Sequence, residues 1–289
     1  KYGADILRIW VASSNYSEDL RIDYSILDQH ADSYRKIRNT FRFLLGNLND
    51  NFEEINFEKI DLSALPELER YMLHKIYNLN LNFNKYFQNY DFHNLYKELL
   101  IFCTIDLSAF YFDIRKDTLY CDNKNSSKRK STILLLNVIL TSLLRWFAPI
   151  LSFTTEEIYK LILKDKKSIH LEKFLTYPDQ FYNEELEKKW SELLNIRNIC
   201  NISIEEKRST KEIGSSLEAH LKIQLDEKLK HITKDIDLSE ICITSNAEVS
   251  FKEQSDIIVE TIKAKGNKCS VCWKINETGC GRSICPQSS

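Results

Sequence analysis

Four of the eight cysteines gather near the C-terminus, and two of them have the spacing of a metal-binding turn. Cys269 and Cys272 are separated by two residues, so both side chains can reach one metal ion from a tight turn. Thiolates favour Zn²⁺, which takes four ligands in structural sites. A redox pair is the competing hypothesis, but the sequence around it lacks a thioredoxin-like βαβ pattern. The spacing therefore predicts a metal site.

A row of arginines marks residues 34–48, which have the sequence YRKIRNTFRFLLGNL. The apolar residues recur with helical spacing and form one stripe, and Arg35, Arg38 and Arg42 form a second stripe beside it. A guanidinium group presents a planar fork of donors that suits a phosphate, so the row is a candidate contact for a nucleic-acid backbone. A solvated helix face is the competing explanation, and spacing alone favours it.

The chain resembles the class I aminoacyl-tRNA synthetases, and among them the isoleucine–tRNA ligases. The first matching block contains Gly3, Ala4, Asp5, Leu7 and Arg8, which in that family follow the KMSKS-type ATP loop. The helix that starts at residues 34–40 matches the beginning of the family's anticodon-binding bundle. Further matching blocks follow in the family's order at residues 107–111, 116–120, 148–151, 155–157 with Phe153, and 214–219.

The resemblance implies a function for the whole protein. An isoleucine–tRNA ligase adenylates isoleucine with ATP and Mg²⁺ and transfers it to the matching tRNA, and we expect such an enzyme to be a cytoplasmic monomer. The family's HIGH-type and KMSKS-type signatures and its editing insertion are absent, and the chain begins with Lys1 instead of Met. We therefore expect a C-terminal fragment that binds the isoleucine-accepting tRNA but does not activate an amino acid on its own.

Basic residues are the expected tRNA contacts. For the phosphate backbone they are Arg35, Arg38, Arg42, Lys128, Arg129 and Lys130, and for the anticodon end they are Trp273, Lys274 and Arg282. Simpler explanations stay open for two of these groups. The basic run at 128–130 also suits a solvated loop, and Trp273 can pack over the metal turn instead of stacking on a base.

The resemblance also implies a ligand set for the metal. Bacterial relatives carry a similar Cys-x-x-Cys-Trp sequence followed by a second Cys-x-x-Cys pair. Cys285 matches the first cysteine of that second pair, but Ser288 stands where the other cysteine is expected. Cys280 is the alternative fourth ligand. The expected Zn²⁺ ligands are therefore Cys269, Cys272, Cys280 and Cys285.

Composition limits the classes of protein that fit. The 289 residues include only six glycines and four prolines, so turn signals are scarce and the fold should be mainly α. The net charge of −2 gives no global nucleic-acid signature, so any RNA contact must come from local patches. The other four cysteines are scattered, which indicates a reducing compartment instead of a disulfide framework.

We expect four parts along the chain. Residues 1–24 connect to a catalytic domain, 25–180 form the helical anticodon-binding bundle, 181–262 form a small α+β junction domain, and 263–289 form a zinc-ribbon-like tail. Helices are predicted over 4–12, 25–48, 66–87, from Asp91 onward, and over 184–208. Strands are predicted over 221–225, 241–244 and 257–262. Thr154 and Glu157 have the spacing of a capping box that starts a helix.

Two predictions concern the helix expected over 131–151, which carries Arg145 as its one charge. The helix is long enough to cross a bilayer, but Asn137, Thr141 and Arg145 form a polar stripe that favours a buried bundle helix. Asp106 falls on an apolar seam of another helix and needs a partner, because an isolated buried charge is costly. We therefore predict that Asp106 and Arg145 pair.

Three alternatives to an isoleucine–tRNA ligase stay open. The valine and leucine enzymes of the same class share the bundle, although the helix at 34–40 together with the Cys-x-x-Cys-Trp tail favours isoleucine. A helical protein-interaction adaptor with a zinc ribbon is a different class, which would show no tRNA preference and no steep salt dependence. A helical membrane protein is the third, and solubility without detergent would exclude it.

Overall fold

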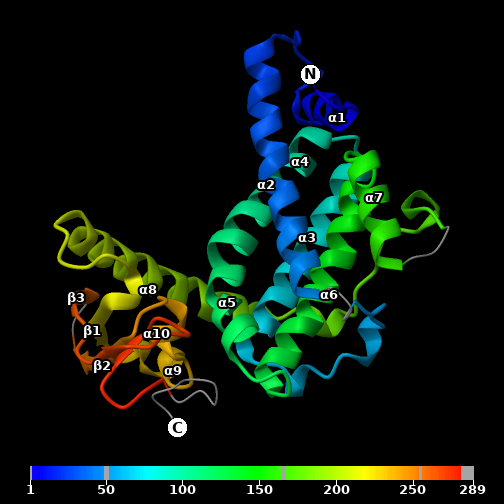
Figure 1. Ribbon diagram of the computed structural model, residues 1–289. Coiled ribbons are helices and arrows are strands. Elements are labelled where there is room, and N and C mark those ends of the chain that lie inside the picture. The colour runs from blue at the N-terminus through cyan, green and yellow to red at the C-terminus, as the bar shows by residue number, and fades with distance from the viewer. Residues whose placement is uncertain (1, 49–51, 164–166, 254–255, 281–289) are drawn as a thin grey trace. The chain divides into compact units, whose positions relative to one another are not determined.

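The computed structural model describes residues 2–48, 52–163, 167–253 and 256–280 (Figure 1). The chain divides into two compact units. The first, the helical unit, comprises residues 1–112 and 130–182, and the second, the α+β unit, comprises residues 113–129 and 183–289. Residues 113–129, which run from the second residue of one helix to the first turn of the next, therefore belong to the α+β unit.

The helical unit is built of helices, and the longer ones α2, α3 and α6 run alongside one another (Figure 1). The helices of this unit are α1 (Ala4–Ser13), α2 (Tyr24–Leu48), α3 (Glu67–Gln88), α4 (Phe92–Ile101), α6 (Ser127–Phe147) and α7 (Ser152–Leu163). Helix α5 (Phe112–Cys121) belongs to the α+β unit from residue 113 onward. Short 3₁₀ turns lie at Phe57–Lys59, Leu62–Ala64, Ile169–Leu171 and Asp179–Phe181. The bundle that the sequence predicts is confirmed.

The apolar stripe of α2 packs into the core as predicted. Ile37, Phe41, Leu44 and Leu48 are each at most 1% exposed. The ring of Phe41 meets the ring of Phe147 from α6 edge to face at 6.1 Å. Such burial supplies most of the free energy that holds a helix in place, because each large apolar side chain contributes about 1.5–3 kcal/mol.

A π-helical segment, η4 (Phe102–Tyr111), joins α4 to α5, and it explains why the predicted ion pair is wrong. Asp106 lies inside this segment and pairs with Lys75 of α3 at 2.7 Å, whereas Arg145 pairs with Glu172 at 3.0 Å. The prediction assumed one helical period along the whole stretch. The i→i+5 pattern of a π-helix changes the direction in which later side chains point, so Asp106 faces α3.

Helix α7 begins differently from the predicted capping box. The helix starts at Ser152, so Thr154 already lies in its first turn. The Asp5 carboxylate from α1 accepts three hydrogen bonds there. The donors are the N–H of Thr154 at 2.8 Å, the hydroxyl of Thr154 at 2.6 Å and the N–H of Phe153 at 3.3 Å. A carboxylate at this end is favoured because the helix dipole places partial positive charge there. Glu157 is therefore not needed for the cap.

The α+β unit is built on the long helix α8 (Glu184–Ser209), which matches the prediction for 184–208 to within one residue. Helix α8 packs against a three-stranded sheet of order β2-β1-β3. The sheet consists of β1 (Ala219–Asp226), β2 (Asn246–Lys252), which pairs with β1 in parallel, and β3 (Ile258–Lys263), which pairs with β1 antiparallel. Alternate residues of β1 face inward, since Ala219, Leu221, Ile223 and Leu225 are buried.

The predictions for β1 and β3 are confirmed, but the strand predicted over 241–244 is wrong. Ile241 ends the short helix α10 (Leu238–Ile241), and Ile243 has a φ of 56° in the turn that follows. The Asp237 carboxylate caps α10 by accepting the N–H groups of Ser239 and Glu240. This local cap competes successfully with the weak strand propensity of the segment. Together with α9 (Lys230–Thr233), α10 forms the crossover that the parallel pair β1 and β2 requires.

Helix α6 is the one helix among the described residues that is long and apolar enough to cross a membrane. Its apolar window is 72% buried inside the protein, as in a core helix. It ends at Phe147 instead of continuing to residue 151, because Pro149 disfavours helical backbone in the residue before it.

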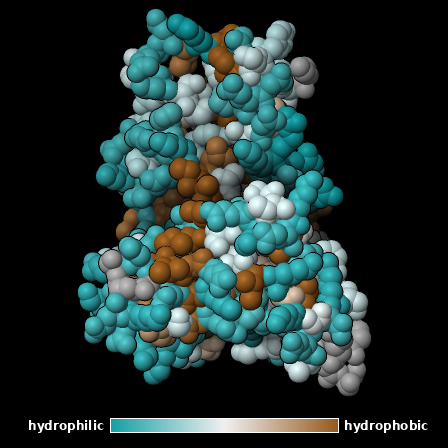
Figure 2. All heavy atoms as spheres, turned by 90° about the vertical axis from the view of Figure 1, so that its left-hand side faces the viewer, coloured by the Kyte–Doolittle hydropathy of each residue, from teal (hydrophilic) through white to brown (hydrophobic). Residues whose placement is uncertain are grey.

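On the face in Figure 2, hydrophilic residues cover most of the surface and hydrophobic residues emerge in patches.

Candidate metal centre and nucleic-acid interface

Three of the four predicted metal ligands lie together. The Sγ atoms of Cys269, Cys272 and Cys280 are within 4.8 Å of one another, and those of Cys269 and Cys280 are 3.9 Å apart. Two thiolates bound to one tetrahedral zinc at about 2.3 Å lie about 3.8 Å from each other. The sulfurs of this cysteine cluster therefore have the spacing that such a metal requires. Cys285 and Arg282 lie outside the described residues.

The backbone around the first two cysteines forms the tight turn that the spacing predicts. The N–H of Cys269 donates to the carbonyl of Lys274 at 2.9 Å, and the N–H of Trp273 donates to the carbonyl of Cys269 at 3.0 Å. The N–H of Val271 points at Cys269 Sγ, 3.4 Å away. This contact orients the Cys269 sulfur within the turn.

A small hairpin holds this turn, and one glycine makes it possible. Strands β4 (Asn267–Lys268) and β5 (Ile275–Asn276) pair antiparallel on either side of the turn. Gly266 precedes β4 with a φ of 116°, and a Cβ there would lie 2.4 Å from the carbonyl carbon and oxygen of Asn276. Any other residue would clash with the opposite strand, so the hairpin requires glycine at this position.

Cys121 is a neighbour of the cluster that sequence reasoning missed. It ends α5, is buried, and packs against Cys269 and Cys272, with its thiol 3.9 Å from the carbonyl oxygen of Val271. Its distance from the cluster along the chain, about 150 residues, gives no signal of this contact. The end of α5 thus supplies part of the apolar support for the turn at residues 269–273.

The remaining described cysteines have the character of core residues. Burial raises the pKa of the Cys103 thiol far above its usual range. Hydrogen bonding with Cys200, together with burial, raises the pKa of Cys242. Thiols that stay protonated are poor nucleophiles and poor metal ligands. The chemistry of cysteine in the described chain therefore concentrates in the cysteine cluster.

Trp273 closes the turn at residues 269–273 and extends into solvent. Its side chain is 60% exposed and its φ is 63°. The Nζ atom of Lys268 lies 5.8 Å from the centre of its ring, which is a cation–π contact. An exposed indole next to positive charge has the form of a stacking platform for an unpaired base. Lys274, the next predicted contact, is half-buried.

The arginine row of α2 lies on the surface of the helical unit. Arg35, Arg38 and Arg42 are all exposed. Arg35 pairs with Asp32 one turn earlier, but the two side chains are 65% and 66% exposed. Such a pair contributes about 0–1 kcal/mol and exchanges readily with a competing anion. The row is accessible to a phosphate backbone.

The second basic group lies in the first turn of α6, not in a loop. Lys128 pairs with Glu240, and Arg129 Nη1 donates to the carbonyl oxygen of Asp122 at 2.8 Å. The negative charge of Glu240 offsets the unfavourable interaction between these cations and the helix dipole. Lys130 is exposed. Of the three predicted contacts in this group, Lys130 is therefore the one placed for a direct approach by RNA.

One polar hollow of about 200 Å³ in the α+β unit brings together two of the predicted contacts, Lys128 and Lys274. Four carboxylates line the same hollow as the two lysines and Cys280. They belong to Asp113, Asp117, Asp237 and Glu240. This acidic lining opposes a bound phosphate, so the hollow positions the two lysines but is not itself a phosphate site.

Comparison with known proteins shows what this chain is similar to. Residues 69–224 match the model of the anticodon-binding domain of tRNA ligase, which is more than half of the chain. The chain is 70% identical to the isoleucine–tRNA ligase of Pelagibacter ubique (strain HTCC1062) over an alignment of 282 residues. This alignment covers 98% of this chain and 31% of the relative.

More distant relatives agree. The isoleucine–tRNA ligase of Agrobacterium fabrum (strain C58 / ATCC 33970) is 39% identical over 285 residues, or 94% of this chain and 29% of the relative. That of Kosmotoga olearia (strain ATCC BAA-1733 / DSM 21960 / TBF 19.5.1) is 36% identical over 305 residues, or 99% and 32%. The chain spans about 30% of the length of the curated relatives that it matches.

Proposed function

The chain belongs to the family of anticodon-binding domains of tRNA ligases, and from that premise we propose that it is the C-terminal, tRNA-holding part of an isoleucine–tRNA ligase. The observation that carries the proposal is the exposed arginine row on α2, which lies on a well-packed helix of the helical unit. The names of the relatives, and the 70% identity to one of them, support isoleucine over valine or leucine.

In this proposal the helical unit fixes the register of the tRNA through its phosphates. Arg42 lies seven residues after Arg35, with Arg38 between them, so the row is about 10 Å long along the helix. Contacts to phosphates carry no sequence information, whereas contacts to base edges and rings do. We assign the phosphate role to this row and Lys130, and the base-stacking role to Trp273. Lys128 and Arg129 would have to exchange their present partners for RNA.

We also propose that the cysteine cluster holds a structural Zn²⁺. Cys269, Cys272 and Cys280 would be three ligands, and Cys285 the fourth. A bound zinc supplies charge that holds the thiolates together, and in small zinc modules it contributes about 10–16 kcal/mol of apparent binding energy. Metal analysis should find one Zn²⁺ per chain, and Cys269→Ser should remove it. A chain that is fully folded without metal and takes up none would contradict this assignment.

For the whole protein we propose cytoplasmic, ATP-dependent attachment of isoleucine to tRNA by a monomeric enzyme. This chain would orient the tRNA and would not by itself bind ATP. Exchange of labelled pyrophosphate into ATP should therefore be undetectable with the chain alone.

Filter binding with three RNAs tests the proposal. The chain should retain an isoleucine tRNA transcript more tightly than a valine tRNA and more tightly than a mixed RNA of equal length. The affinity should fall steeply as salt rises from about 50 to 200 mM, because bound phosphates release counterions. Equal affinity for the three RNAs together with a flat salt dependence would instead favour the protein-interaction adaptor.

A further inference from the structure

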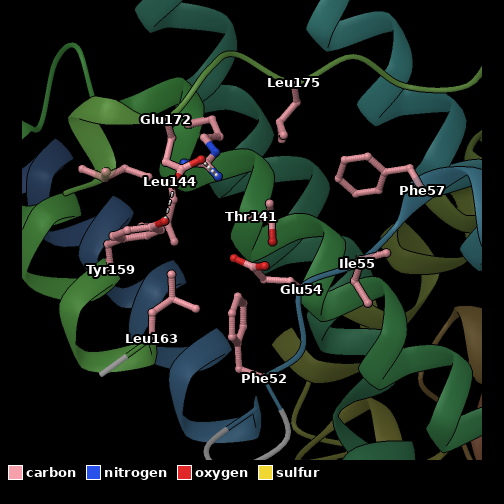
Figure 3. A pocket seen from close by; sticks show the side chains of 12 residues that line it. Phe52, Glu54, Ile55, Phe57, Thr141, Leu144, Tyr159, Leu163, Glu172 and Leu175 are labelled. Atoms are coloured by element: carbon pink, nitrogen blue, oxygen red, sulfur yellow. Dashed lines mark hydrogen bonds and ion pairs between the residues drawn. The ribbon is translucent and has the colours of Figure 1, made fainter. Parts of the chain in front are cut away.

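A cavity in the helical unit has no part in the functions described above. It has a volume of about 240 Å³ and lies between the C-terminal half of α6, helix α7 and the segment that precedes the 3₁₀ turn at Phe57–Lys59 (Figure 3). We call it the α6–α7 cavity. An engineered cavity of about 150 Å³ is large enough to hold benzene, so this one has room for a fused pair of rings.

Two polar side chains of α6 that line this cavity carry buried atoms without hydrogen-bond partners among the described residues. Within the described part of the chain, no partner exists for the buried Oγ1 of Thr141 or for the buried Nε and Nη1 of Arg145. The two residues are four apart and therefore lie on one face of the helix. An unsatisfied buried donor costs about 1–3 kcal/mol, so three such atoms around one space indicate that something else satisfies them.

Arg145 is held firmly by its other contacts. Its Nη2 atom pairs with Glu172 at 3.0 Å, and its side chain is only 13% exposed. Glu172 also accepts a hydrogen bond from the hydroxyl of Tyr159 at 2.8 Å, and the guanidinium lies 5.7 Å from the centre of the Tyr159 ring. The donors of Arg145 are thus fixed in place before any ligand arrives, which reduces the entropy lost on binding.

Charge excludes a phosphate as the ligand. The lining includes one cation, Arg145, and two carboxylates, Glu172 and Glu54, so its net charge is negative. In Figure 3 the Glu54 carboxylate and the Thr141 hydroxyl point toward each other. The ligand should therefore be neutral, with acceptors for Arg145 and Thr141 and with donors for Glu54.

The rest of the lining favours a flat ring. Phe52, Phe57 and Tyr159 line the cavity together with aliphatic side chains. Aromatic side chains form stacking surfaces for unstacked bases, and each such base gains about 1–3 kcal/mol. A nucleobase combines a flat apolar face with donors and acceptors along its edge, which matches both halves of this lining.

We propose that the α6–α7 cavity binds one unstacked guanine base of the tRNA, and this proposal rests on the tRNA-binding function above. Among the four bases only guanine carries two adjacent donors, N1–H and N2–H₂, which a single carboxylate can accept. Its O6 and N7 atoms are acceptors that suit arginine. Glu54 would take the two donors, while Arg145 and Thr141 would donate to the acceptors.

The test uses isoleucine tRNA transcripts in which inosine replaces each unpaired guanosine in turn. Inosine lacks the N2 amino group but keeps the rest of the base. With the wild-type chain, replacement at one position should weaken binding by about 5- to 150-fold. With Glu54→Gln, the preference for guanosine over inosine at that position should shrink toward one. Thr141→Val, which replaces the hydroxyl with a methyl group of similar size, should weaken binding of the guanosine transcript.

Glu58→Gln is the matched control, because Glu58 lies in the same segment, is exposed and does not line the cavity. It should keep the full preference for guanosine. The proposal is overturned if no position distinguishes guanosine from inosine, or if the preference survives in Glu54→Gln, and the cavity is then filled by water. Tight tRNA binding without the preference refutes only the base pocket, whereas no tRNA binding at all refutes the proposed function.

Discussion

Asp5 connects two helices that are far apart in the sequence, and its removal should destabilise the helical unit. The residue is buried on α1 and accepts three hydrogen bonds from the first turn of α7. The substitution Asp5→Ala leaves the N–H groups of Phe153 and Thr154 without their acceptor. Asp5→Asn keeps an acceptor oxygen in about the same place but removes the charge.

The geometry gives the size of both effects. Two of the three bonds, to Thr154, are short, and a hydrogen bond to a charged acceptor contributes about 1.5–3 kcal/mol. We take the lower value for each, because water can partly replace them, and expect Asp5→Ala to cost about 3 kcal/mol. Asp5→Asn should cost about 1 kcal/mol, which is the typical interaction of one charge with a helix terminus.

Urea denaturation followed by far-ultraviolet circular dichroism measures these free energies of unfolding, and hydrogen exchange at the amides of residues 153 and 154 localises them. Asp32→Ala is the control. Asp32 is exposed and pairs only across the surface with Arg35, so this change should stay within about 0.5 kcal/mol of wild type. If Asp5→Ala costs no more than Asp32→Ala, the carboxylate does not cap α7 and the reasoning fails.

Three further predictions concern other contacts. Gly266→Ala should open the β4–β5 hairpin and so lower the metal affinity measured in a competitive chelator titration. Gly46→Ala is the control, because Gly46 has free space around it in α2, and this change should raise the stability by about 0.5–1 kcal/mol. The clash at Gly266 is refuted if the two substitutions have equal effects on metal affinity and stability. Asp106→Asn should lower the free energy of unfolding by about 2 kcal/mol, which lies between the values for surface and buried ion pairs. Double-mutant cycles should show that Asp106 is energetically coupled to Lys75, whereas its effect should add to that of a change at Arg145. The hydrogen bond from Lys160, together with those from Ser168 and Ile169, lowers the pKa of Glu156 below its ordinary value of 4.5. The contribution of Glu156 to stability is therefore present above pH 4.5 and is lost as the pH falls through the lowered pKa. Between pH 6 and 3 the free energy of unfolding should change less with pH in Glu156→Gln than in the wild type, and parallel curves would refute this.

Sequence patterns predicted the elements that a single period governs. The 3.6-residue stripe of α2 and the long run of α8 appear in the structure at their predicted places, because burial of one helix face determines both. Strand β1 was predictable for the same reason, since its alternate residues are buried. Strand β2 was not predicted, because its residues are half-buried or exposed and show no apolar alternation.

Contacts between distant segments were beyond sequence reasoning. The partner of Asp106 depends on a π-helical segment that has no periodic signature, and the cap of α7 comes from Asp5, almost 150 residues away. The cluster of Cys269 and Cys272 was predictable because their spacing is local, and Cys280, which the sequence offered as the alternative fourth ligand, lies with them. Cys121 was missed because only the fold brings it to them.

The α6–α7 cavity was likewise only partly predictable from the sequence. The polar stripe of α6 was visible in the sequence, and its position on a buried helix is confirmed. That Thr141 and Arg145 line a cavity with unsatisfied atoms follows only from packing against α7 and the segment around Glu54. Functional sites are where local rules and the packed structure are expected to disagree.

The salt dependence of tRNA binding tests the central claim, that the arginine row of α2 holds the phosphate backbone, most directly. Replacing Arg35, Arg38 and Arg42 with glutamine should reduce the slope of log affinity against log salt by about 2–3, which is 0.7–0.9 for each lost phosphate contact. A control with the same change in net charge replaces the exposed lysines Lys85, Lys188 and Lys234 with glutamine, and it should keep the wild-type slope. Equal slopes for the wild type and the arginine variant would contradict the account.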